Sequence, residues 1–355
     1  MFLKVKKKLF ISRLKDNEED CFSGGHISSK VFLEHYKKIY AENLDIFHIG
    51  FLQYKPRFIN RLFVLANLLK GRFNGLTRQK EVHFENLLKS GVYDEVIFDS
   101  SLYGNLVKIT SHYPVKKTVI FQNCEVDYFM GEYLFSKWYS FINLKYAYFS
   151  ERRTIEHSDS NIFLTEYDYQ RSRRFYYYKA DFFISTVLQK YFLDTFATRQ
   201  DQIPAKGLIY YFIGSNNVQN SRALRLLLKD TYFRPLYVYG AVCDSAMSQN
   251  LSLNNVYLKR KVMNVAVETK GKILLAPLFG GSGIKIKILE ALSNSNQVIT
   301  TIEGISGLEF AVKSGAIIVS EFTTHPSDHK LPDWDNFKLD LENYFLNSKL
   351  TQLGD

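Results

Sequence analysis

Residues 272–292, with the sequence KILLAPLFGGSGIKIKILEAL, constrain the fold of this chain more than any other stretch. The first part, from Ile273 to Pro277, is apolar or small throughout and predicts a short buried strand. Three glycines follow within four positions. The apolar residues after them recur at helical spacing; they are Ile284, Ile288, Leu289 and Leu292. The stretch therefore predicts a strand, a glycine loop and a helix in succession.

This junction suits an anionic ligand. Glycines let the backbone turn sharply and present N–H groups at a helix start, which carries about half a unit of positive charge. Lys285, in the expected first turn, adds a full charge. Glu290 is seven residues beyond Gly283, which is close to two turns or roughly 10 Å along a helix axis, and its carboxylate can there accept hydrogen bonds from ribose hydroxyls. The pattern favours a nucleoside diphosphate. The alternative is an ordinary glycine connection, with Lys287 and Glu290 as a surface ion pair.

The segment from residue 280 to 308, GGSGIKIKILEALSNSNQVITTIEGISGL, resembles the donor-site segment of family 4-like glycosyltransferases, which have the GT-B fold. In that family a glycine loop, a lysine and a helix glutamate hold a nucleotide sugar. The usual pattern has two glutamates, of which the second matches Glu290, whereas Ser282 stands at the first. The sequence fits a Gly-small-Gly-x-Lys-x-Lys-x-x-Glu version found in some members. The resemblance implies an α/β fold with two Rossmann-like domains facing a cleft and a C-terminal helix that crosses back to the first domain.

The length of 355 residues is enough for two domains. Residues 198–206 are largely polar and contain Pro204, which makes them the best boundary. We predict an N-terminal acceptor-binding domain over 1–203, a C-terminal nucleotide-sugar-binding domain over 204–330, and a closing helix with a tail over 331–355. The pair Asp333 and Asp335 has the Asp-x-Asp spacing of metal-dependent glycosyltransferases, but it follows Pro332, so we interpret it as a helix start. No metal and no cofactor are predicted.

The resemblance also assigns residues on the donor side. The loop after the predicted strand from Leu208 to Ile213 carries no cation, so Lys285 takes more of the phosphate binding, assisted by Lys287. The candidates for catalysis are Lys285, Glu290 and Glu125. The candidates for donor binding are Gly214, Ser215, Gly280, Gly281, Ser282, Gly283, Ile284 and Lys287.

The first domain is predicted to repeat the strand, loop and helix pattern. A strand from Lys8 to Ser12 precedes a loop from Asp16 to Ser29. Two later strands, Glu95 to Phe98 and Thr118 to Phe121, end in polar residues, and ligands of open α/β sheets bind beyond such ends. The acceptor-side candidates are Gly24, Gly25, His26, Gln122, Asn123 and Glu166. Gln122 stands where the family often has histidine. The alternatives are an ordinary connection for the glycine loop and helix capping for Asn123 and Glu125.

Charge is unevenly distributed along the chain. The net charge is +10, and residues 1–200 hold 30 Lys and Arg against 22 Asp and Glu. Such an excess attracts nucleic acid, anionic lipid or diphosphate-linked substrates, but no nucleic-acid-binding motif is present, so we predict no nucleic-acid partner. Residues 54–80 mix basic and apolar positions; they predict either a helix on an anionic membrane surface or one packed on its own domain. For the basic aromatic stretch at residues 171–179 we favour a solvated face.

Three widely spaced cysteines indicate reduced thiols in a cytoplasmic protein. We find no signal peptide and no membrane span, which predicts a cytoplasmic location or a peripheral one on the inner face of the membrane. The predicted function is transfer of a sugar from a nucleoside-diphosphate sugar to a glycan or lipid-linked acceptor in bacterial surface polysaccharide biosynthesis, with retention and without metal. Two alternatives stay open: an inverting GT-B transferase with His26 or Glu125 as base, and an inactive GT-B-like nucleotide-binding subunit.

Overall fold

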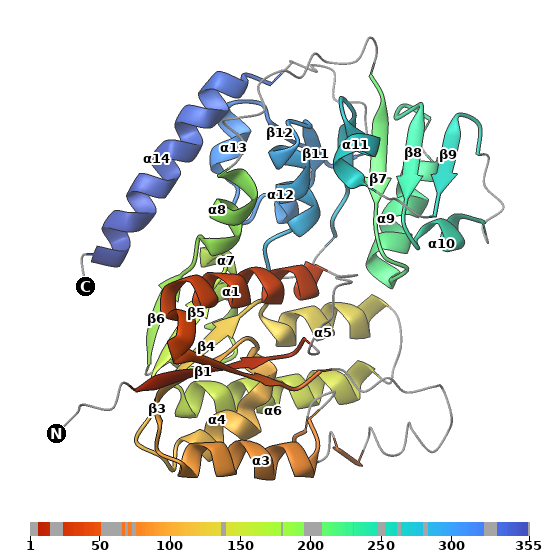
Figure 1. The fold of residues 1–355 in the computed structure, drawn as a ribbon. Coiled ribbons are helices and arrows are strands. Elements are labelled where there is room, and N and C mark those ends of the chain that lie inside the picture. The colour runs from red at the N-terminus through yellow and green to blue at the C-terminus, as the bar shows by residue number, and fades with distance from the viewer. Residues whose placement is uncertain are drawn as a thin grey trace. The chain divides into compact units, whose positions relative to one another are not determined.

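The computed structural model describes residues 6–14, 24–50, 66–67, 70–72, 76–135, 140–178, 180–194, 208–229, 231–247, 253–260, 264–279, 283–322 and 332–353. The chain divides into two compact units, residues 1–188 and 189–355 (Figure 1). The predicted boundary between residues 203 and 204 lies outside the described residues and stays a prediction.

Unit 1 is built on a six-stranded sheet in the order β2-β1-β3-β4-β5-β6, and every pairing in it is parallel. The strands are β1 (Lys7–Ser12), β2 (Leu44–His48), β3 (Tyr93–Phe98), β4 (Lys116–Phe121), β5 (Ser160–Phe163) and β6 (Asp181–Ile184). The helices are α1 (Gly24–Tyr40), α3 (Arg78–Lys89), α4 (Gly104–Thr110), α5 (Glu125–Phe135), α6 (Ser140–His157) and α7 (Glu166–Ser172).

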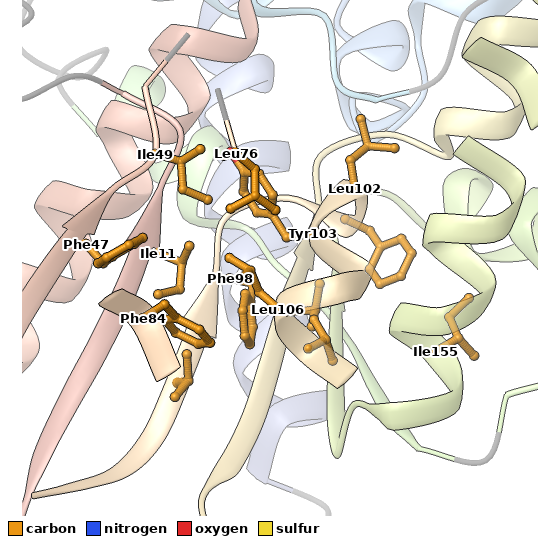
Figure 2. Close-up of a cluster of buried hydrophobic side chains, with 14 of the residues drawn as sticks. Ile11, Phe47, Ile49, Leu76, Phe84, Phe98, Leu102, Tyr103, Leu106 and Ile155 are labelled. Atoms are coloured by element: carbon orange, nitrogen blue, oxygen red, sulfur yellow. The ribbon is translucent and has the colours of Figure 1, made fainter. Parts of the chain in front are cut away.

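Alternating residues of β1 face two different helical layers. The ring of Phe10 lies 5.6 Å from that of Tyr36 in α1. Ile11 points to the opposite face and joins a buried cluster with residues of α3 and α4 (Figure 2). In that cluster the ring of Phe84 lies 6.4 Å from that of Phe98. The sheet is thus buried on both faces, which is why its strands read as nearly continuous apolar runs.

Unit 2 is built on a second six-stranded parallel sheet in the order β12-β11-β10-β7-β8-β9. The strands are β7 (Tyr210–Ile213), β8 (Leu236–Tyr239), β9 (Val256–Lys259), β10 (Ile273–Ala276), β11 (Val298–Thr300) and β12 (Ile317–Val319). The helices are α8 (Val187–Leu193), which spans the division between the units, α9 (Val218–Lys229), α10 (Cys243–Met247), α11 (Val265–Thr269), α12 (Ile286–Ser293), α13 (Phe310–Lys313) and α14 (Trp334–Leu353). This winding is that of a Rossmann-like domain.

Helix α14 packs on its own unit. The ring of Tyr344 lies 4.8 Å from that of Phe310 in α13, and its hydroxyl accepts a hydrogen bond from Gln189 at 3.2 Å. The prediction that this helix crosses back to the first domain stays a prediction. Within the described ranges, no helix combines the length and apolar character needed to span a bilayer.

Most predicted strands are confirmed, and one loop is corrected. Helix α1 begins at Gly24, so the expectation that Gly24, Gly25 and His26 lie in a loop reaching Ser29 is wrong. A Cβ on Gly25 would lie 2.6 Å from the Arg13 guanidinium, which donates to the carbonyl oxygen of Gly25. The glycine thus serves a close helix contact rather than a turn. Strands β6, β9 and β12 were not predicted.

Candidate functional site

The two strands at the centre of the second sheet, β7 and β10, are neighbours although β8 and β9 separate them in sequence. The chain winds to one side of β7 and then returns to the other. Ligands of open α/β sheets bind at this switch point, beyond the carboxyl ends of the strands. The loops that leave these ends are residues 214–217 after β7 and the segment from Pro277 to Lys285 after β10.

Helix α12 begins at Ile286, and Lys285 is its N-cap rather than part of its first turn. The backbone of Lys285 is extended, with φ −92° and ψ 95°, and its carbonyl accepts the N–H of Ile288 at 2.8 Å. Gly283 has φ +77°, a conformation that residues with a side chain adopt only with strain. The lysine charge and the positive helix end therefore coincide. Ile284 is buried beside them. Gly280, Gly281 and Ser282 lie outside the described residues.

Glu290 lies about one turn after the start of α12 and is partly buried. Burial raises the pKa of its carboxyl to about 6. Among the residues that the structure describes, its carboxylate has neither a hydrogen-bond nor an ion-pair partner, and the surface ion pair with Lys287 is not formed. A partly desolvated carboxylate without a partner is costly unless a ligand supplies donors.

The side chain of Lys287 points back to β7. Its Nζ donates to the carbonyl oxygen of Ile213 at 3.4 Å and to Oδ1 of Asn220 at 3.2 Å, and it lies 5.1 Å from the ring centre of Phe212. Burial, and then the charge of Lys285, lower the pKa of Lys287 to about 8.

Gly214 occupies a crowded position beneath the first loop. A Cβ there would lie 2.8 Å from the Asn220 side chain. Gly240, with φ +90°, approaches the carbonyl oxygen of Gly214 so closely that its own Cβ would lie 2.6 Å away. Ser215, next along the loop, is exposed, and its carbonyl oxygen accepts from Asn220 Nδ2 at 3.0 Å.

A polar network lies at the carboxyl ends of β1, β3 and β4 in unit 1. Arg13 donates through Nε to Ser29 Oγ at 2.8 Å and through its terminal nitrogen to Gln122 Oε1. Gln122 Nε2 in turn donates at 2.9 Å to Ser29 Oγ and to the carbonyl oxygen of Asp99. Asp99 is fully buried; burial raises the pKa of its carboxyl, and the charge of Arg13 opposes the rise. Gln122 thus lies in a polar network at the end of β4, and its role on the acceptor side stays a prediction.

The first turn of α5 carries the next candidates. Asn123 Nδ2 donates to Glu125 Oε1 at 3.3 Å, and burial raises the pKa of the Glu125 carboxyl. Glu151 of α6, fully buried, accepts the backbone N–H of Glu125 at 3.0 Å and that of Val126 at 3.2 Å. Burial, with Glu125 as a second cause, raises the pKa of Glu151 to about 8.

The remaining acceptor-side candidates are spread over two helices. Gly24, Gly25 and His26 form the start of α1. Glu166 is exposed at the start of α7, and its carboxylate accepts from Gln170 at 2.6 Å. The hydrogen bonds of Glu166 in the described part of the chain do not join it to the network around Gln122.

The described residues contain no group of three or more His, Cys, Asp or Glu side chains that could hold a metal ion. Asp333 caps α14 instead: its Oδ1 accepts the backbone N–H of Asn336 at 2.9 Å. The interpretation of the Asp-x-Asp pair as a helix start is confirmed.

No match to the chain was found among protein-family models or among curated proteins. Solved structures do match. Sucrose-phosphate synthase from Thermosynechococcus elongatus is 12% identical with a TM-score of 0.63, and the match covers 98% of this chain and 97% of that one. A UDP-forming trehalose-phosphate synthase from Burkholderia xenovorans is 11% identical with a TM-score of 0.55 and 98% coverage of both chains. TarM is 11% identical with a TM-score of 0.52, covering 96% and 93%.

The chain has the GT-B fold. In this GT-B protein the comparisons extend over nearly the whole chain, so both Rossmann-like units belong to the shared architecture. Because the sequence identities are only 11% to 12%, these similarities show the fold and nothing further.

Sequence reasoning missed several residues of these GT-B units. Arg13 directly follows β1, and the rule applied to β3 and β4 would have found it. Asn220 and Arg222 lie on α9; the Arg222 guanidinium is 5.1 Å from the ring centre of Phe279, in the loop after β10. Glu151 had no local signal, because a glutamate inside a helix is ordinarily solvent-exposed.

Proposed function

We propose that this chain is a family 4-like glycosyltransferase that transfers a hexosyl group from a nucleoside-diphosphate sugar. One observation carries the proposal: Lys285 and Glu290 both belong to α12, at the switch point of a Rossmann-like sheet. Lys285 is the N-cap, and the carboxylate of Glu290 has no partner among the described residues. The cation and the helix end suit a diphosphate, and the carboxylate suits a ribose. The fold shared with sucrose-phosphate synthase and trehalose-phosphate synthase supports this reading.

The chemistry follows from the charge that develops on the departing diphosphate. Lys285 and the N–H groups of the glycine loop, Gly281 to Gly283, stabilise that charge in a preorganised site without a metal. Glu290 accepts hydrogen bonds from the ribose hydroxyls and orients the nucleoside. We propose that the anomeric configuration is retained by front-face attack of the acceptor.

The acceptor belongs to unit 1, where Arg13, Gln122, Asn123 and Glu125 cluster at the strand ends. We propose a growing glycan or lipid-linked glycan of the bacterial surface, capsule or lipopolysaccharide among them, as its class. Such an acceptor places the enzyme at the inner face of the cytoplasmic membrane. The basic stretch 54–80, most of which lies outside the described residues, is the proposed contact with anionic lipid. Co-sedimentation with anionic but not neutral vesicles tests that contact.

A thermal-shift screen tests the donor site. The purified protein is heated with UDP, GDP, CMP, TDP or ADP, and the screen is repeated with Glu290→Ala and Lys285→Ala. A nucleotide present at about a hundred times its dissociation constant adds roughly 2.7 kcal/mol of stability. We expect one nucleotide to raise the melting temperature and both substitutions to abolish the shift. Absence of a shift with every nucleotide would contradict the proposed donor site.

One observation favours an inverting reaction as a second candidate. Glu125 is 6% exposed, and burial raises the pKa of its carboxyl, as a general base on the acceptor side requires. The anomeric configuration of the product, determined by NMR, separates inversion from retention.

A further inference from the structure

Lys287 leaves α12 in an unexpected direction for a lysine of a phosphate site. Its ammonium contacts the last carbonyl of β7 at 3.4 Å and Asn220 Oδ1 at 3.2 Å, with the face of Phe212 beside it. All three groups belong to β7 and α9, the elements that flank the first loop of the unit. Lys287 therefore ties the glycine-loop helix to the other side of the switch point.

Asn220 connects Lys287 to the first loop, residues 214–217, through hydrogen bonds on both sides of its amide group. While its Oδ1 accepts from Lys287, its Nδ2 donates to the carbonyl oxygen of Ser215 at 3.0 Å and to Ser215 Oγ at 3.3 Å. Its backbone N–H donates to Asn217 Oδ1 at 2.7 Å. Gly214 leaves room for this side chain, because a Cβ there would lie 2.8 Å from it. Both Oδ1 and Nδ2 of the Asn220 side-chain amide therefore have hydrogen-bond partners.

We propose that Lys287 is a positioning residue that does not touch the donor, and that through Asn220 it holds the loop at residues 214–217 in place beside a diphosphate bound at the start of α12. The inference rests on the proposed function and changes the role of Lys287 from phosphate binding to support. Packing alone does not explain a lysine here, because an uncharged side chain would fill the same space without the cost of desolvating an ammonium.

Lys272 offers a matched control. Its Nζ lies 5.0 Å from the ring centre of Tyr237 and donates to the carbonyl oxygen of Glu268, so it too combines a ring contact with a backbone acceptor. It precedes β10, at the amino end of that strand, and among the described residues its contacts with Tyr237 and Glu268 do not involve the loop at residues 214–217. Removing it takes away the same kind of group without the proposed link.

The experiment measures dissociation constants for UDP, GDP, ADP and TDP by calorimetry, together with melting temperatures. The proteins are the wild type, Lys287→Met, Asn220→Ala, the double variant and Lys272→Met. For the nucleotide that the wild type binds best, we expect Lys287→Met and Asn220→Ala each to weaken binding about tenfold. The double variant should be no weaker than either single one, because both break the same chain of contacts. Lys272→Met should keep the wild-type constant.

The outcomes separate the inference from the function on which it rests. Additive losses in the double variant would mean that Lys287 contacts the donor itself, which overturns the inference. An unchanged constant in Lys287→Met, with a lowered melting temperature like that of Lys272→Met, also overturns it. If the wild type binds none of the four nucleotides, the proposed function fails and the inference with it. Should Lys287→Met not fold, Asn220→Ala and Asn220→Asp carry the test: aspartate keeps the acceptor for Lys287 but lacks the donor to Ser215, so both variants should weaken binding, and wild-type binding by Asn220→Asp would overturn the inference.

Discussion

The carboxyl group of Glu151, inside α6, accepts the backbone N–H of Glu125 at the start of α5 at 3.0 Å. The same group accepts Val126 N–H at 3.2 Å, Ser101 Oγ at 2.9 Å and the Tyr176 hydroxyl at 3.1 Å. Orphan amides of a helix N-terminus are usually capped by a neighbour in sequence. Here a different helix supplies the cap, and it thereby fixes the backbone that carries the acceptor-side candidate Glu125.

The first prediction concerns the pH dependence of stability at Glu151. Its pKa is raised to about 8 in the folded chain, so the folded state keeps a proton that the unfolded chain releases near pH 4.5. The contribution of Glu151 to stability is therefore full below that pH and is lost as the pH rises toward 8, by up to about 1.4 kcal/mol per pH unit. Relative to Glu151→Gln, the wild type should lose stability between pH 5 and 8, measured by urea unfolding.

The control for this prediction is Glu151→Ala, which removes the acceptor altogether. It leaves the buried amides without a partner and should cost about 2–4 kcal/mol near pH 5; the cost should shrink as the pH rises, because only the wild type carries the titrating carboxyl. A wild-type and Glu151→Gln difference that stays constant from pH 5 to 8 would contradict the prediction.

The second prediction concerns nucleotide binding at Glu290. The pKa of its carboxyl is raised to about 6 by burial, and hydroxyl donors of a ribose stabilise the ionised form. Binding should therefore weaken as the pH falls below 6, by up to about tenfold per unit. Glu290→Gln should bind less tightly at pH 8 and lose this dependence, measured by calorimetry from pH 5 to 8.

A nucleotide's own terminal phosphate titrates near pH 6 as well, so the informative quantity is the difference between the two proteins. Glu268→Gln is the control, because Glu268 is paired with Lys259 at 2.9 Å. An equal pH dependence in wild type and Glu290→Gln would show that the phosphate alone is responsible.

The third prediction uses two glycines with positive φ. An alanine at Gly240 would have φ near +90° and a Cβ 2.6 Å from the carbonyl oxygen of Gly214. At Gly91, with φ +65°, a Cβ would meet no atom within 4 Å. Gly91→Ala should therefore cost only the backbone strain of about 1 kcal/mol, whereas Gly240→Ala should cost at least twice that. Thermal unfolding of both variants measures the difference; equal losses would mean that the backbones of Gly214 and Gly240 separate freely.

The order of strands and helices was readable from the sequence because each strand is an apolar run followed by a polar or glycine-rich turn. The pattern from Ile273 to Leu292 predicted the strand, the loop and the helix. The helix begins at Ile286, so Ile284 and Lys285, which were expected in it, precede it. Strand β6 was not predicted, although Phe182, Phe183 and Ile184 form an apolar run; about 40% of each phenylalanine side chain is exposed in the structure.

The site was less readable than the fold. Glycine, lysine and glutamate spacing located the donor side, but the direction of a side chain depends on packing between elements distant in sequence. Lys287 was expected near the phosphates, and its Nζ contacts Asn220, 67 positions earlier. The buried cap by Glu151 likewise arises only when α6 packs beside α5. Sequence patterns indicate which face of a helix or strand is buried and where turns occur. They do not indicate which side chains of distant elements will contact one another.

The last prediction concerns Arg13, whose guanidinium joins β1 to α1 and β4. It donates to Ser29 at 2.8 Å and to Gly25 at 2.6 Å, and its backbone N–H donates to Asp99 Oδ2 at 3.0 Å. Arg13→Met leaves the fully buried Asp99 carboxyl without its neighbouring cation, so it should lower the free energy of unfolding by about 2 kcal/mol at pH 8.

The loss should shrink when Asp99→Asn is added, because the neutral amide has no charge to compensate; the double variant isolates the electrostatic part. Arg152→Met, which breaks an exposed pair with Glu156, is the control and should cost less than about 0.5 kcal/mol. If the losses of Arg13→Met and Asp99→Asn simply add, the guanidinium acts through its hydrogen bonds to Ser29 and Gly25 instead. The starting position of α1 would then depend on those two bonds rather than on the charge.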